Sequence, residues 1–110
     1  MTVQEINQML GEIGLPYAYY QFDEGTGQEP PFICWYIEGI NDLYADNINY
    51  QGIGQLTVEL YTDAKDFALE TVVEQLFTAH DLSYAKDGTY IDSERMHETI
   101  YTTEVIINAE

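Results

Sequence analysis

The chain has 110 residues, of which 45% are hydrophobic, and its 20 acidic and 3 basic side chains give a formal net charge of −17. This length predicts a single domain, residues 1–110, with a core of modest size. The charge argues against binding to a nucleic-acid backbone or to an anionic membrane surface, because both depend on lysine and arginine. It favours instead a basic partner, bound cations or mimicry of nucleic acid.

The only cysteine, Cys34, excludes an intramolecular disulfide and lies in an apolar run, where we expect a small core residue. The absence of disulfides fits a reducing cytoplasm. The N-terminal stretch lacks the basic and apolar regions of a signal peptide, and no apolar stretch reaches the length of a membrane span.

The first predicted element is a short helix over residues 2–11, in which Thr2 and Glu5 have capping-box spacing. A strand is predicted over residues 17–22, followed by a loop that contains glycine and proline. The next strand, over residues 32–37, is apolar on both faces and is therefore expected in the middle of a sheet.

Residues 38–50 are polar and are expected to form a loop. A strand pattern resumes over residues 50–61, where apolar and polar residues alternate from Leu56 onward. Gly52 and Gly54 interrupt this strand and predict a bulge or a close backbone approach.

A second helix is predicted over residues 66–80, since Asp63 and Asp66 lie where a helix start favours acidic residues. Its buried stripe is expected at helical spacing, with Phe77 at the edge, and comprises Leu69, Val72, Val73, Leu76 and His80. Acidic residues also recur at intervals of four along one flank. We interpret this flank as a solvated face or as a surface for a basic partner, formed by Asp66, Glu70 and Glu74.

Near the C-terminus, the Asp87–Gly88 pair predicts a turn between two short strands, residues 82–85 and 89–92. Residues 96–107 alternate as a long last strand. The predicted order is therefore α-β-β-β-α-β-β-β. This order is typical of an α+β fold, with a mostly antiparallel sheet of about five to six strands and two helices packed against it.

The residues show no pattern of a catalytic, metal or cofactor site. His80 and His97 belong to no zinc motif. Ser83 and Ser93 lie in no nucleophile elbow. Any two of the twenty acidic residues could meet in space as a catalytic pair, but this reflects only their abundance, and no pattern supports it. The sequence therefore favours a protein that is not an enzyme and needs no cofactor.

Several short motifs, spread over nearly the whole chain, point to a known family. The strongest is Val58–Asp63, VELYTD, with Lys65 and Asp66 directly before a helix. The others are short stretches elsewhere in the chain: Pro16–Tyr17, Pro31–Tyr36, Ala45–Asn47 with Tyr50, Glu70, Glu74, and Tyr90–Met96 leading to Ile100–Tyr101. Together they resemble the small tail-completion, or tail-terminator, proteins of long-tailed phages and prophages of Gram-positive bacteria.

The resemblance implies a structural protein of the virion, located at the tail–head junction and in the host cytoplasm during assembly. Such proteins form a ring, commonly a hexamer, that caps the head-proximal end of the tail tube. The implied partners are further copies of the chain, the major tail tube protein and a head-completion or connector protein, without sequence-specific nucleic acid binding and without a membrane. These motifs do not distinguish a tail-completion role from a neighbouring head-closure role.

The interface residues expected from the motifs are polar or aromatic and have no visible chemistry. They are Asp46, Asn47, Tyr50, Glu59, Tyr61, Asp63, Lys65, Asp66, Glu70 and Glu74. A second hypothesis explains the charge more directly: an acidic protein that mimics nucleic acid and inhibits a host DNA-binding enzyme. Only the acidic flank of the second helix has spacing that would imitate phosphates.

Overall fold

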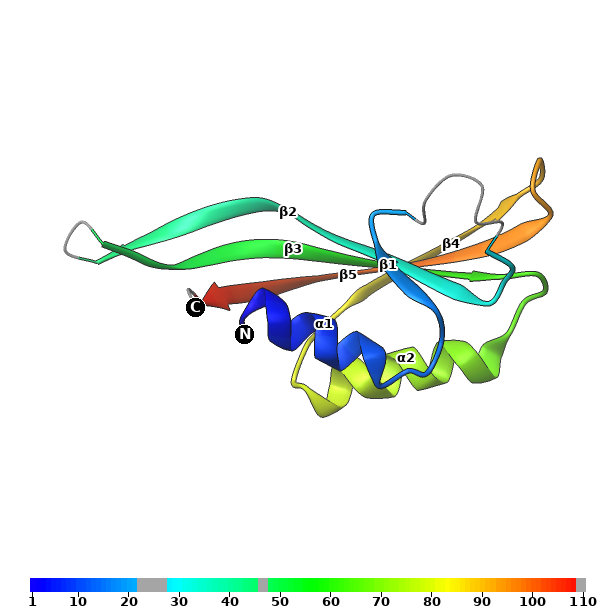
Figure 1. The fold of residues 1–110 in the computed structure, drawn as a ribbon, viewed down its shortest axis with the longest axis horizontal. Coiled ribbons are helices and arrows are strands. Elements are labelled where there is room, and N and C mark those ends of the chain that lie inside the picture. Colours follow the sequence, from blue (N-terminus) through cyan, green and yellow to red (C-terminus); the bar gives the residue numbers. More distant parts are fainter. Residues whose placement is uncertain (22–27, 46–47, 109–110) are drawn as a thin grey trace.

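The computed structural model describes residues 1–21, 28–45 and 48–108, with residues 39–45, 48–51 and 108 described by their backbone alone. The described residues form two helices and one five-stranded sheet (Figure 1). In chain order the elements are α1 (Val3–Gly11), β1 (Tyr17–Tyr19), β2 (Phe32–Ala45), β3 (Ile48–Thr62), α2 (Phe67–Ala79), β4 (Ala85–Ile91) and β5 (Met96–Asn108). The predicted α+β class is confirmed.

The sheet has the strand order β1-β2-β3-β5-β4. The short β1 runs parallel to β2, and the other neighbours are antiparallel. In the middle of the sheet, Val58 of β3 lies opposite Trp35 of β2 on one side and Tyr101 of β5 on the other. The expectation of a mostly antiparallel sheet is therefore confirmed.

Both helices begin with the caps that the sequence predicts. Thr2 Oγ1 accepts a hydrogen bond from the Glu5 backbone N–H at 3.1 Å, and Glu5 Oε1 accepts one from the Thr2 N–H at 2.8 Å. At the start of α2, Asp66 Oδ1 accepts from the Leu69 N–H at 3.0 Å. These bonds satisfy backbone donors that a helix leaves unpaired in its first turn.

The two helices pack on the same side of the sheet, where the core lies (Figure 1). In the core, Ile6 and Leu10 of α1 and Val73 and Phe77 of α2 are fully buried. They pack against alternate residues of the three long strands: Ile33, Trp35, Leu56, Val58, Leu60, Tyr101 and Val105. The period-two alternation in β3 thus produces one buried face, as expected.

The buried stripe of α2 is rotated from the predicted one. Val73 and Phe77 are fully buried, whereas Val72 is 41% exposed and His80 lies at the exposed C-terminal cap. Glu70 lies on the buried side, with only 3% of its surface exposed. A carboxylate can occupy this position because two lysines reach it, a compensation that hydrophobic periodicity does not reveal.

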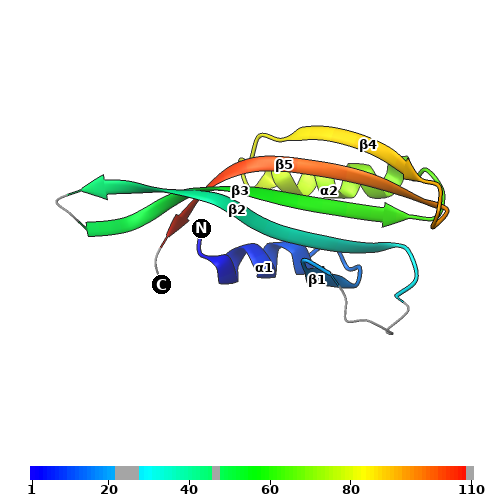
Figure 2. The same cartoon turned by 90° about the horizontal axis from the view of Figure 1, so that it is seen from above.

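The prediction of a loop over residues 38–50 was wrong. β2 continues to Ala45 and β3 begins at Ile48, so the two strands form a long hairpin arm that extends beyond the rest of the sheet (Figures 1 and 2). Strand pairing supplies backbone hydrogen bonds that override the weak strand propensity of asparagine and aspartate. The register shifts between Glu38 and Asn41, opposite Gly54, which agrees with the predicted bulge.

The predicted hairpin around Asp87–Gly88 was also wrong. β4 is one continuous strand, and Gly88 lies within it opposite Thr99. The turn instead lies between β4 and β5, where Arg95 adopts a left-handed φ of 55°. The long β5 provides partners for the whole of β4, and this pairing outweighs the local turn preference of an Asp–Gly pair.

The first strand is shorter than the predicted 17–22, because β1 ends at Tyr19. Tyr20 takes a φ of 70°, which bends the chain out of the strand. Its backbone N–H still donates a hydrogen bond to the Trp35 carbonyl at 2.8 Å. Phe22 lies outside the described residues.

Candidate functional site

The sheet face turned away from the helices, here called the open face, is acidic and aromatic. Strand alternation and register place on it Phe32, Cys34, Tyr36 and Glu38 of β2, Gln55, Thr57, Glu59 and Tyr61 of β3, Asp87 and Thr89 of β4, and Glu98, Ile100, Thr102, Glu104 and Ile106 of β5. None of these positions is a lysine or an arginine. No helix or strand of the described chain covers this face.

Two pairs of stacked rings form the aromatic part of the open face. The Tyr20 and Tyr36 rings lie 5.0 Å apart between centroids with an interplanar angle of 10°. The Phe32 and Tyr61 rings lie 4.8 Å apart at 20°. Tyr20 is 55% exposed, so its ring offers both apolar area and a hydroxyl to solvent.

A pair of carboxyl groups lies beside these rings. The Tyr61 hydroxyl donates a hydrogen bond to Glu98 Oε2 at 2.8 Å, and Glu59 Oε1 lies 3.4 Å from the same hydroxyl oxygen. A hydroxyl has one proton, so it satisfies only one of the two carboxyl groups well. Burial, together with the hydrogen bond and the charge of Glu98, raises the pKa of Glu59 to about 7.

The neighbours of this pair stay neutral. Burial, together with the charges of Glu59 and Glu98, raises the pKa of the Cys34 thiol to about 11. Burial and the same two glutamates also raise the pKa of the Tyr61 hydroxyl. Cys34 is therefore a protonated, buried thiol, which lacks the thiolate needed for nucleophilic chemistry.

On the helix-covered side, a second group of carboxylates has the opposite surroundings. This Glu70 cluster comprises Lys65, Glu70, Glu74, Lys86 and Tyr101. Glu70 Oε2 lies 2.9 Å from Lys65 Nζ, and Glu70 Oε1 lies 2.8 Å from Lys86 Nζ. Lys86 Nζ also lies 2.7 Å from Glu74 Oε2, which accepts a hydrogen bond from the buried Tyr101 hydroxyl at 2.8 Å.

The lysines keep these carboxylates ionised. Burial acts to raise the pKa of Glu70, but the hydrogen bonds and charges of Lys86 and Lys65 outweigh it and lower the pKa. Lys86 likewise lowers the pKa of Glu74. The cluster joins α2 to β4 and β5, and it occupies both lysines of the chain. It is therefore a structural element of the fold.

The structure places the ten predicted interface residues in several different surroundings. Glu59 and Tyr61 lie on the open face, Asp66 caps α2, and Asp63 is exposed between β3 and α2. Tyr50 lies in β3 beside a second register shift, described by its backbone alone. Asp46 and Asn47 lie outside the described residues.

The remaining three predicted residues, Lys65, Glu70 and Glu74, belong to the Glu70 cluster. The interpretation of Glu70 as an exposed flank residue is corrected, because its side chain is 3% exposed and bound by two lysines. Glu98 was not predicted as a site residue, because its place beside Glu59 depends on the β3–β5 register. The alternation over residues 96–107 was the available signal, but it does not say which strand pairs with it.

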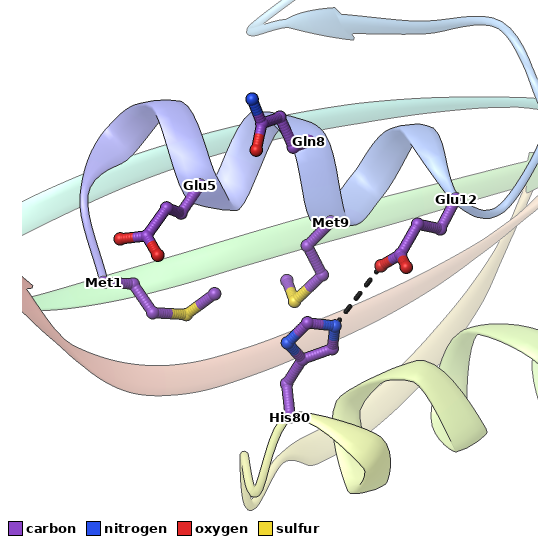
Figure 3. Close-up of a pocket in the computed structure, with 6 residues that line it drawn as sticks. All are labelled: Met1, Glu5, Gln8, Met9, Glu12 and His80. Carbon is purple, nitrogen blue, oxygen red and sulfur yellow. Dashed lines mark hydrogen bonds and ion pairs between the residues drawn. The ribbon is translucent and has the colours of Figure 1, made fainter.

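A shallow groove of about 320 Å³ lies between α1 and the end of α2 (Figure 3). In this groove, His80 Nε2 lies 3.3 Å from Glu12 Oε2, and the two side chains face one another from the ends of their helices. The Glu5 carboxylate is engaged in the α1 cap. In the part of the chain that the structure describes, no three His, Cys, Asp or Glu side chains gather in a way that could hold a metal ion.

Comparison with protein-family models finds none that matches this chain, and comparison with curated proteins finds no significant match either. Among the described residues, no helix is both long enough and apolar enough to cross a membrane.

Proposed function

We propose that this protein is a structural tail-completion protein of a phage or prophage. In this proposal it forms a ring, a hexamer, that caps the head-proximal end of the tail tube and prepares it for joining to the head. The main structural support is that, within the described part of the chain, the helices leave two large surfaces uncovered, the hairpin arm and the open face. The motifs around Val58–Asp63 point to the same role.

The hairpin arm fits a subunit that is completed by its neighbours. The molecule measures 51 × 30 × 22 Å and has a radius of gyration of 15.0 Å, whereas a compact domain of this length would have about 13 Å. β1 pairs with β2 only at residues 33–35, and β5 pairs with β3 only from Gln51 onward. The described part of the arm beyond Gln51 is therefore two-stranded, and such a ribbon is marginally stable alone.

The proposed partners are further copies of the chain, the major tail tube protein and a head-completion or connector protein. A ring requires a heterologous contact, in which one surface of a subunit meets a different surface of the next. An elongated sheet with an arm at one end provides two such different surfaces. The proposal includes no catalytic activity and no cofactor, and it places the protein at the tail–head junction, after assembly in the host cytoplasm.

The alternative, a protein that mimics nucleic acid, receives less support from the geometry. Its best argument was the row Asp66, Glu70 and Glu74 on one helix flank. Glu70 is buried against two lysines, Glu74 is bound to Lys86, and Asp66 caps α2, so this row does not present three free charges. Regularly spaced anionic groups on an exposed surface are what such mimicry requires.

The test is assembly of the purified chain with purified tail tubes. Native mass spectrometry and electron microscopy should show hexameric rings, alone or on tube ends, and tubes of defined length in the presence of the protein. A chain that stays monomeric with tubes at every concentration, and that instead blocks a DNA-binding nuclease, would contradict the proposal and favour the mimic.

A further inference from the structure

We propose that the open face is a docking surface for an arginine-bearing segment of another protein, with one guanidinium group bound between Glu59 and Glu98 and another against the stacked rings of Tyr20 and Tyr36. This inference does not depend on the tail role, since it rests on the surface of the sheet alone.

The oxygens of the carboxyl pair can accept more hydrogen bonds than the neighbouring donors supply. Glu59 and Glu98 share the single hydroxyl of Tyr61, which lies 2.8 Å from one carboxyl group and 3.4 Å from the other. An arginine side chain supplies five N–H donors in a planar fork and stays charged at all relevant pH values. One guanidinium group could therefore satisfy both carboxylates and neutralise their mutual repulsion.

The other groups around the pair provide no competing cation. On the strands packed beside it, the facing ionisable groups are Cys34 and Tyr36 of β2, Tyr61 of β3 and Asp87 of β4, and the residue paired with Glu98 on β4 is Thr89. All of these are neutral or acidic. The two lysines of the chain are bound in the Glu70 cluster on the other side of the sheet.

The aromatic pairs suit arginine for a second reason. A guanidinium plane stacks on an aromatic face through cation–π attraction, and exposed examples contribute about 0.5–1 kcal/mol. The Tyr20–Tyr36 pair is partly exposed, and Ile106 on the same face is 50% exposed. Tyrosines beside apolar area and a charged anchor are the composition that protein interfaces favour.

The charge identifies the occupant as a basic segment and not a second copy of the chain. A second copy carries the same −17, and its lysines are held in ion pairs of their own. Its remaining basic residue is Arg95, in the turn between β4 and β5. Contact between the open face and another copy would therefore bring like charges together without enough cations to offset them.

Docking of arginine at the pair should release a proton. The unbound Glu59 carboxyl has a pKa raised to about 7 by burial and by Glu98, so it is largely protonated at pH 6 and largely ionised at pH 8. A guanidinium binds the ionised pair, so protons compete with it. The affinity should therefore rise about tenfold between pH 6 and pH 8, a range in which ordinary exposed glutamates do not titrate.

The experiment is an NMR titration with a short blocked peptide of alternating arginine and glycine, near physiological salt, at about pH 6 and pH 8. We expect shift changes confined to open-face residues, and an affinity about tenfold higher at the higher pH. Glu59→Gln should lower the affinity at the higher pH about fivefold and abolish the pH dependence. Glu94→Gln, the same charge change in the exposed β4–β5 turn, should leave both unchanged.

A second variant, Tyr36→Ala, tests the aromatic part and should weaken binding severalfold while leaving its pH dependence intact. The proposal is overturned if Glu59→Gln binds as the parent does, if the affinity is the same at both pH values, or if the shift changes map elsewhere. Concentration-dependent dimerisation through the open face, detected without peptide, would also overturn it in favour of a second copy.

Discussion

The Glu70 cluster and the Glu59–Glu98 pair put glutamates on opposite sides of one sheet in contrasting surroundings. Glu70 is held by Lys65 and Lys86, which keep it ionised and tie α2 to the sheet. Glu59 faces another glutamate and a single hydroxyl, and its pKa is raised. Both lysines of the chain lie on the helix-covered side, and under our proposal the open-face pair receives its cation from another protein.

The two sites should also affect stability in opposite ways as the pH changes. The pKa values of Glu70 and Glu74 are lowered in the folded state, so their contribution is present above about pH 4.5 and is lost as the pH falls below it. The pKa of Glu59 is raised to about 7, so its contribution is present below about pH 4.5 and is lost as the pH rises towards 7.

The largest expected effect separates the helix-covered side from the open face. Phe77→Ala removes a fully buried ring and should lower the free energy of unfolding by about 3–5 kcal/mol. Tyr20→Ala on the open face, where the ring is 55% exposed, should lower it by less than about 1 kcal/mol. Urea unfolding measures both, and equal losses would show that the open face belongs to the core.

Glu70→Gln should lower the free energy of unfolding by about 2 kcal/mol at neutral pH. The substitution leaves Lys65 without its anion and Lys86 with Glu74 alone, but both lysines are about 40% exposed and can turn to solvent, which limits the loss. Glu94→Gln in the exposed turn is the control and should change stability by less than about 0.5 kcal/mol. Equal effects of the two substitutions would contradict a structural role for the cluster.

Tyr101→Phe should lower the free energy of unfolding by about 1.5 kcal/mol. The ring stays in the core, and only the hydroxyl that donates to Glu74 Oε2 at 2.8 Å is removed. Tyr90→Phe changes the same group in the exposed β4 strand and should have almost no effect. If both variants unfold at the same urea concentration as the parent, the hydroxyl does not stabilise the cluster.

Glu59→Gln should raise the free energy of unfolding at about pH 8 by about 1 kcal/mol and leave it nearly unchanged at about pH 5. The gain is small because solvent screens a half-buried carboxyl group. Unfolding curves at the two pH values measure the difference. A loss of stability at the higher pH would mean that Glu59 stabilises the folded state as an anion.

The local patterns of the sequence predicted those parts of the fold that depend on neighbouring residues. Both helix caps, the alternation in β3 and the α+β class followed from spacing along the chain. The loop predicted over residues 38–50 and the turn at Asp87–Gly88 failed because long-range strand pairing overrode local preference. Local periodicity does not identify pairing partners that are distant in sequence.

The candidate site was only partly predictable for the same reason. Glu59 and Tyr61 were identified from the sequence, but Glu98 joins them only through the register of β5 against β3. Glu70 was assigned to an exposed flank because its two lysines come from a loop and from β4, and hydrophobic periodicity does not detect such partners. Charge counts showed that cations are scarce, but not which carboxylates bind them.

The most direct test is an NMR titration that follows the side-chain carboxyl carbon of Glu59 in the folded protein. The contrast between the two sides of the sheet predicts a midpoint of about 7 for Glu59 and a midpoint below the ordinary glutamate value for Glu70. The Glu59 midpoint should fall on addition of the arginine peptide. Midpoints for Glu59 and Glu70 that both lie near the ordinary glutamate value would contradict the account.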